Sequence, residues 1–66
     1  MNKFRTVANQ AATAERNGDY LEASKTWKQA GEVARLSINK SWCSIREEHC
    51  MNTIKLKQNE QKQLRG

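Results

Sequence analysis

The sequence predicts a small all-α domain, and three observations favour this fold class. The chain of 66 residues has no proline and only three glycines, the two residue types that most disfavour a helix. Its apolar residues recur at steps of three and four, which brings side chains onto one face of an α-helix. No segment alternates polar and apolar residues with the period of two typical of a strand. We therefore expect an antiparallel helical hairpin with a third helix packed on it.

The first helix is predicted over residues 2–17. Gly18 closes it, because glycine readily adopts the left-handed conformation that ends many helices, and Arg16 supplies a cation where the helix dipole favours one. The apolar face of this helix is rich in alanine and contains Phe4, Val7, Ala8, Ala11 and Ala14 or Glu15.

The second helix is predicted over residues 19–36, with Asp19 as its N-cap. Gly31 lies inside this helix and costs about 1 kcal/mol relative to alanine, so we expect another backbone to cross closely there. The seam mixes small side chains with two large rings, so that a neighbouring helix can approach closely. It consists of Tyr20, Ala23, Trp27, Ala30 and Ala34, and we assign structural roles to Gly18, Asp19, Ala23, Ala30 and Ala34.

The third helix is predicted over residues 39–56, and its junction with the second has two interpretations. Ser37 and Asn39 are good N-caps, which favours a break. The apolar series nevertheless continues through Ile38, Trp42 and Ile45 without glycine or proline, so one uninterrupted helix is the alternative. We favour the break. A single domain would then cover residues 1–56, and the polar segment 57–66 is predicted to be a frayed helix end or a disordered tail.

The charge balance limits the classes of partner. A net charge of +5 suits nucleic acid, anionic lipid or an acidic protein surface. The basic residues are scattered among glutamates, however, which is typical of a solvated mixed surface. We expect no signal peptide, no membrane contact and no spanning helix, since no apolar run approaches the roughly 20 residues that a membrane-spanning helix needs.

The reactive side chains do not form a recognisable catalytic or metal site. The one histidine, His49, lacks a matching serine or aspartate, and no glycine-rich phosphate loop is present. Cys43, Glu47 and Cys50 share a helix face, but zinc sites usually draw ligands from two segments, and no second cluster exists. We expect no enzyme, cofactor or metal. The two cysteines lie about 10 Å apart along a helix, too far for a disulfide, so reduced thiols in the cytoplasm are expected.

So small a core is close to the limit of stability, which favours association with a partner or a second copy, and we expect a homodimer. Trp27 and Trp42 are either core residues or interface anchors. Arg46 pairs either with a carboxylate of another chain or with Glu22 or Glu32 of the second helix.

The sequence resembles two known families. The run Gly18-Asp19-Tyr20 with Ala23 and Ala30 resembles the turn and second helix of a tetratricopeptide repeat (TPR), although the chain is only about one and a half repeats long. Over residues 4–50 the chain also resembles the AraC negative regulator (ANR) family of small bacterial transcriptional regulators. The ordered residues that carry this second resemblance are Glu15, Arg16, Gly18, Asp19, Tyr20, Ala23, Trp27, Ala30, Ala34, Asn39, Trp42, Arg46 and Cys50.

The ANR resemblance implies a cytoplasmic protein that binds AraC-type transcription activators directly and represses them, and family members also act on histone-like nucleoid proteins. We expect the partner or dimer interface on the second and third helices, at Tyr20, Trp27, Asn39, Trp42, Ile45, Arg46, His49 and Cys50. The alternative function is a direct DNA-binding regulator of helix-turn-helix type. Against it, the third helix opens with Lys40-Ser41-Trp42 and soon meets Glu47-Glu48, which phosphates would repel.

Overall fold

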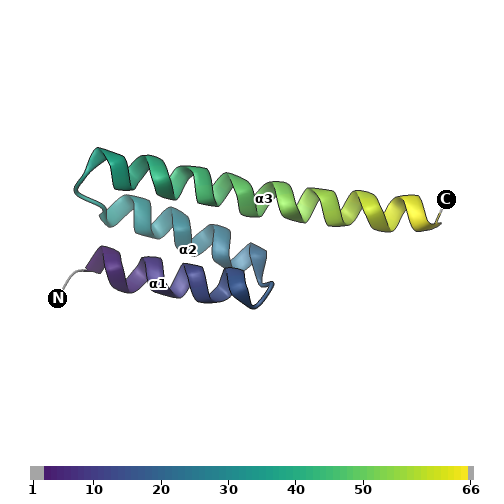
Figure 1. Cartoon of the computed structure of the whole chain (residues 1–66), viewed down its shortest axis with the longest axis horizontal. Helices are drawn as coiled ribbons and strands as arrows, with labels where there is room; N and C mark the ends of the chain where they lie inside the picture. The colour runs from purple at the N-terminus through teal and green to yellow at the C-terminus, as the bar shows by residue number, and fades with distance from the viewer. Residues whose placement is uncertain (1–2, 66) are drawn as a thin grey trace.

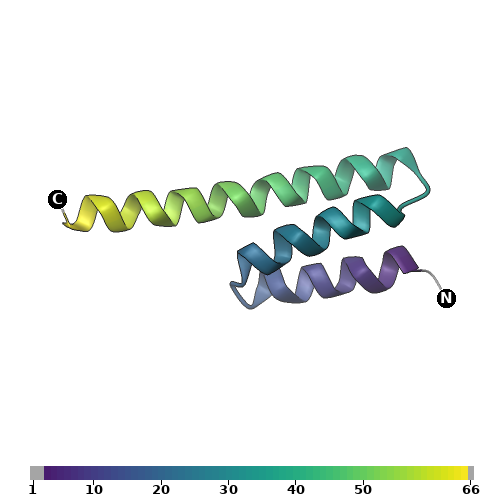
Figure 2. The same cartoon turned by 180° about the vertical axis from the view of Figure 1, so that it is seen from behind.

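The computed structural model describes the backbone of residues 3–65 and the side chains of residues 3–58. Three helices, α1 (Lys3–Arg16), α2 (Tyr20–Val33) and α3 (Ser37–Arg65), make up this part of the chain, and it contains no strand. They lie side by side and antiparallel, with α2 in the middle (Figures 1 and 2). α2 packs along both neighbours, whereas α1 and α3 contact each other only weakly. The prediction of an all-α hairpin plus a third helix is confirmed.

The turn between α1 and α2 is built by backbone hydrogen bonds around Gly18. The Gly18 N–H donates to the Glu15 carbonyl at 3.1 Å, and the Asp19 N–H donates to the Ala14 carbonyl at 2.9 Å. This pair of bonds is the Schellman motif, and it requires the left-handed φ of +80° that Gly18 adopts. Asp19 occupies the N-cap position of α2, but its side chain makes no capping hydrogen bond, so that part of the prediction is wrong.

The junction between α2 and α3 is a real break. Ala34 takes an extended conformation, with φ −70° and ψ 138°, directly after the last residue of α2. α3 begins at Ser37, and the Leu36 carbonyl accepts the N–H groups of Asn39 and Lys40 at 3.1 Å each. The alternative of one continuous helix is wrong, because the chain reverses here. Asn39 lies within α3 and is not its N-cap.

The third helix does not end at residue 56 but continues to Arg65. Within the range whose side chains are described, Lys57 is tied to the second helix, because its Nζ lies 5.0 Å from the centroid of the Tyr20 ring. A cation over an aromatic face in this way holds the two elements together where α2 begins. No helix in the described residues has the length and apolar character to cross a membrane.

The core consists of small side chains packed around one large ring. Trp27 is 2% exposed, and it is surrounded by alanines and by the two cysteine thiols of α3. A Cβ added to Gly31 would lie 3.5 Å from the Cβ of Cys43, which is ordinary van der Waals contact. α3 therefore crosses α2 closely at this point, as expected, but it leaves space for a methyl group. The other buried apolar residues are Ala8, Ala11, Ala23, Ala30, Ala34, Cys43 and Cys50.

Candidate functional site

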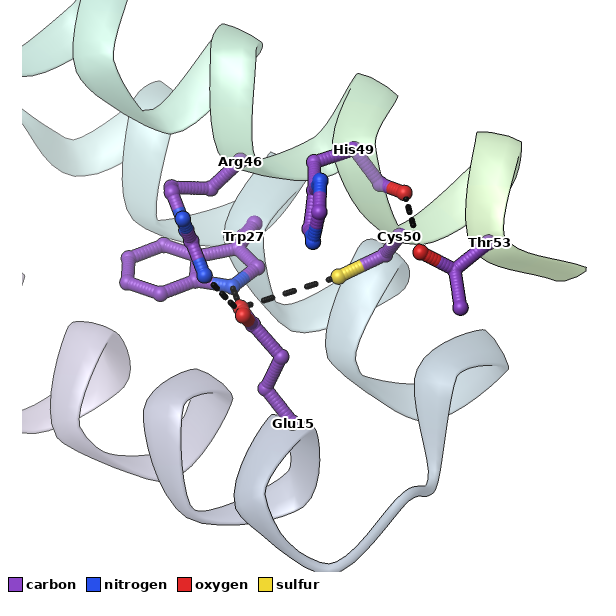
Figure 3. Close-up of polar contacts among 6 residues, drawn as sticks. All are labelled: Glu15, Trp27, Arg46, His49, Cys50 and Thr53. Carbon is purple, nitrogen blue, oxygen red and sulfur yellow. Dashed lines mark hydrogen bonds and ion pairs between the residues drawn. The ribbon is translucent and has the colours of Figure 1, made fainter.

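One carboxylate joins all three helices. Glu15, in the last turn of α1, accepts a hydrogen bond from the indole Nε1 of Trp27 in α2 at 2.9 Å and forms an ion pair with Arg46 of α3 (Figure 3). The Sγ of Cys50, also from α3, donates to the same carboxylate at 3.7 Å. We call these four residues the Glu15 cluster. It links α1 and α3 by polar contacts across the intervening helix.

Burial explains why the cluster needs each of these partners. The indole N–H of Trp27 is shielded from water and would lose a hydrogen bond without an acceptor. The Glu15 side chain is only 14% exposed, so its charge needs a nearby cation, which Arg46 supplies from a more exposed position. Burial also raises the pKa of the Cys50 thiol, against the opposing charge of Arg46, and this keeps the thiol protonated as a donor.

A second aromatic ring covers the cluster from the α3 side. The ring of Trp42 meets that of Trp27 edge to face, with centroids 4.8 Å apart and planes at 83°. Trp27 is buried, whereas Trp42 is 47% exposed, so the pair leads from the core to the surface. Beside it lies an open recess of about 260 Å³, lined by Ala12, Glu15, Arg16, Trp27, Trp42 and Arg46.

Trp42 also belongs to a row of exposed side chains along one side of α3, at the edge of the face that packs on the core. Successive members of the row are four, three, four, three and four residues apart, so they share one side of the helix. The exposed fractions of Ile38, Ile45 and Leu56 are 74%, 62% and 62%, which is high for large apolar side chains. We call this row the α3 stripe, and it consists of Ile38, Trp42, Ile45, His49, Asn52 and Leu56.

The residues predicted to form an interface do not lie on one surface. Trp27 and Cys50 are buried within this chain and offer no surface to a partner, so the core interpretation of Trp27 is correct. Trp42, Ile45 and His49 are exposed on the α3 stripe.

The remaining three interface candidates are spread over the molecule. Arg46 is half-buried in the Glu15 cluster. Tyr20, beside Lys57, and Asn39, in the first turn of α3, are half-buried near opposite ends of the packed region.

Sequence reasoning missed the role of Glu15. Arg46 pairs with this residue of the first helix, and the expected pairing with Glu22 or Glu32 of the second helix is wrong. A signal was present, because Glu15 continues the spacing of the apolar face at Ala8 and Ala11. A carboxylate in such a position is usually paired when it is buried.

The described side chains at these sites make hydrogen bonds, an ion pair and an aromatic contact. Among the residues whose side chains are described, no three of the types His, Cys, Asp and Glu come together as a metal site. Burial raises the pKa of the Cys43 thiol as well, so both thiols are poor nucleophiles near neutral pH. The geometry defines a small three-helix domain with an exposed apolar stripe. Comparison with protein-family models, with curated proteins and with solved structures found no match, so the resemblance to the ANR family stays a prediction.

Proposed function

We propose that this protein is a small transcriptional regulator that binds an AraC-type transcription activator by protein–protein contact and represses it. The observation that carries the proposal is the α3 stripe, where Ile38, Trp42 and Ile45 are exposed on one side of a helix. Contiguous apolar side chains at the surface of a small domain typically mark a site where another protein binds. Trp42 is the natural anchor, since tryptophan concentrates in the energetic centres of interfaces.

The Glu15 cluster supports the resemblance from which the partner class is taken. Glu15, Trp27, Arg46 and Cys50 all belong to the ordered pattern that resembles the ANR family, and they contact one another from three different helices. Trp42, another residue of the pattern, packs on Trp27. Residues of a family pattern that contact one another support a family resemblance better than the same residues would if they were scattered over the surface.

The mechanism we infer is occlusion. The activator would lay an apolar surface along the first half of the α3 stripe, and the bound regulator would then hinder its dimerisation or its contact with DNA. The net charge of +5 would raise the rate of encounter with an acidic patch on the activator. By the same resemblance, histone-like nucleoid proteins are a second class of partner for this surface.

The first experiment is affinity capture of the tagged chain from its native bacterium, with mass-spectrometric identification of the bound proteins. We expect an AraC-type activator among them. With that activator purified, Trp42→Ala and Ile45→Ala should each weaken binding about tenfold or more. Leu21→Ala is the matched control, because Leu21 is 55% exposed but lies on α2, and it should leave the affinity unchanged. An equal loss from all three variants would contradict the assignment of the surface.

Direct DNA binding is tested with the same protein. A helix-turn-helix motif crosses its two helices at about 90–120°, whereas here the helices lie alongside one another (Figure 1). In gel retardation of promoter DNA over a range of salt concentrations, we expect only weak binding that salt suppresses for every sequence alike. Retardation of one promoter selectively at moderate salt would replace our proposal with a DNA-binding regulator.

A further inference from the structure

We propose that a second copy of this chain binds the α3 stripe, with the two α3 helices antiparallel and Ile45 of each copy packed against Leu56 of the other. The inference names the face, orientation and register of a dimer. It does not rest on the proposed function, because it concerns this chain alone. It would affect that function, however, since a second copy covers the same stripe that we assign to the activator.

The spacing of the stripe is that of a coiled-coil seam. In a heptad written abcdefg, Trp42, His49 and Leu56 take the a positions, and Ile38, Ile45 and Asn52 take the d positions. This seam is separate from the face of α3 that α2 already covers, where Cys43 and Cys50 are buried. α3 thus has one apolar face that packs inside the chain and a second one that is largely exposed in the described part of the chain, apart from the Trp42 ring, which packs on Trp27.

The shape of the molecule leaves this second face accessible. α3 has 29 residues, against 14 in α2, and it runs on past the other two helices (Figure 2). At 1.5 Å per residue it is about 43 Å long. A partner helix of the same length can therefore lie along the whole seam, on the side away from α2. A second copy of α3 has that length.

The charges beside the seam select the orientation and the register. Glu48 and Lys55 are exposed and occupy successive g positions, and in an antiparallel pair the g positions of the two helices face each other. When Ile45 faces Leu56 of the other copy, Glu48 faces Lys55. Two-fold symmetry makes this ion pair twice. His49 then faces Asn52, so the polar residues of the seam also meet each other.

The competing arrangements lack this complementarity. A shift of one heptad in either direction would place Glu48 against Glu48 of the other copy, or Lys55 against Lys55, and like charges opposite each other are unfavourable. In a parallel pair, each g position faces the following e position of the partner, so Glu48 would face Thr53 and gain no ion pair. Among these arrangements, the antiparallel register with Ile45 against Leu56 is the one that pairs opposite charges. It places Trp42 and Ile38 opposite the polar positions Asn59 and Gln63, so its apolar contact is the Ile45–Leu56 layer, which two-fold symmetry makes twice.

Sedimentation velocity of the pure full-length chain over a range of concentrations tests the proposal. We expect a reversible monomer–dimer equilibrium. Glu48→Lys and Lys55→Glu should each raise the dimer dissociation constant about fivefold or more, because each replaces two attractions by two repulsions. An equimolar mixture of the two variants should restore dimerisation as a heterodimer, since both charge pairs are then attractive again. Circular dichroism checks that each variant remains helical.

A substitution in the α3 stripe provides a second test of the proposed dimer. Ile45→Asp should abolish the dimer, whereas Leu21→Asp, which places the same charge at a similarly exposed position on α2, should not. A chain that stays monomeric at all concentrations overturns the proposal. So does a dimer for which the mixture of charge variants associates no better than either variant alone. Because no activator is present, a dimer that behaves as expected stands even if AraC-type activators fail to bind.

Discussion

Replacing Glu15 with alanine is predicted to destabilise the whole domain, and the structure indicates by how much. The variant leaves the buried indole N–H of Trp27 without its acceptor, which costs about 1–3 kcal/mol. It also removes the ion pair with Arg46, and this pair contributes only about 0.5–1 kcal/mol because the Arg46 side chain is 34% exposed. The free energy of unfolding should therefore fall by about 1.5–4 kcal/mol. A chain of this size has about 3–10 kcal/mol in total, so a large share would be lost.

Urea denaturation followed by circular dichroism and tryptophan fluorescence measures this loss. With a slope of about 1 kcal/mol per molar urea, the midpoint should move down by about 1.5–4 M. Glu15→Gln keeps an acceptor for the Trp27 indole and loses only the charge, so it should cost about 1 kcal/mol. Glu22→Ala is the control, since Glu22 is an exposed glutamate of α2, and it should change stability by less than about 0.5 kcal/mol. If Glu15→Ala were equally mild, the cluster would not hold the helices together.

Three further predictions concern the backbone, the thiols and the end of α3. Gly31→Ala should stabilise the fold by up to about 1 kcal/mol, because the new methyl group makes ordinary van der Waals contact. Gly18→Ala should destabilise it by about 1 kcal/mol, because Gly18 has a positive φ. Thermal unfolding of both variants measures these changes. Burial raises the pKa of both thiols above 9.0. The stability that the protonated thiols contribute is therefore present below pH 9.0 and is lost as the pH rises through the folded-state pKa. The fall in the thermal unfolding midpoint at alkaline pH should be smaller in Cys43→Ala than in the unsubstituted chain. Lys57→Gln should lower stability by about 0.5–1 kcal/mol, measured by urea denaturation, and Tyr20→Leu should make that substitution neutral.

Local rules were sufficient for the features that depend on a few neighbouring residues. The helices follow from apolar spacing, and the end of α1 follows from the conformational freedom of Gly18. The break before α3 was inferred from two cap candidates, and the break exists, but neither Asn39 nor Asp19 caps a helix with its side chain in the way expected. A cap needs a particular side-chain rotamer as well as a suitable residue type, and the rotamer cannot be read from sequence.

The pairing of Arg46 with Glu15 could not be predicted by such rules. The two residues are 31 positions apart, and their contact depends on how far α1 and α3 approach each other around α2. Helix periodicity places Arg46 beside the buried face of α3, where Glu22, Glu32 and Glu15 are all plausible partners. The two tryptophans were ambiguous for the same reason. Their spacing places them on helix faces, but only the packing of three helices decides that Trp27 is enclosed and Trp42 is not.

The structure connects this buried pairing to the surface that we assign to binding. Glu15 holds the indole of Trp27, and the ring of Trp27 supports that of Trp42 at 4.8 Å. Arg46, the other partner of Glu15, lies on α3 one turn after Trp42. Since α1 and α3 make little direct contact, these side chains fix where the first half of the α3 stripe lies relative to α1. The α3 stripe is therefore a surface whose position depends on a carboxylate two helices away, and a substitution at Glu15 would disturb binding without touching the bound protein.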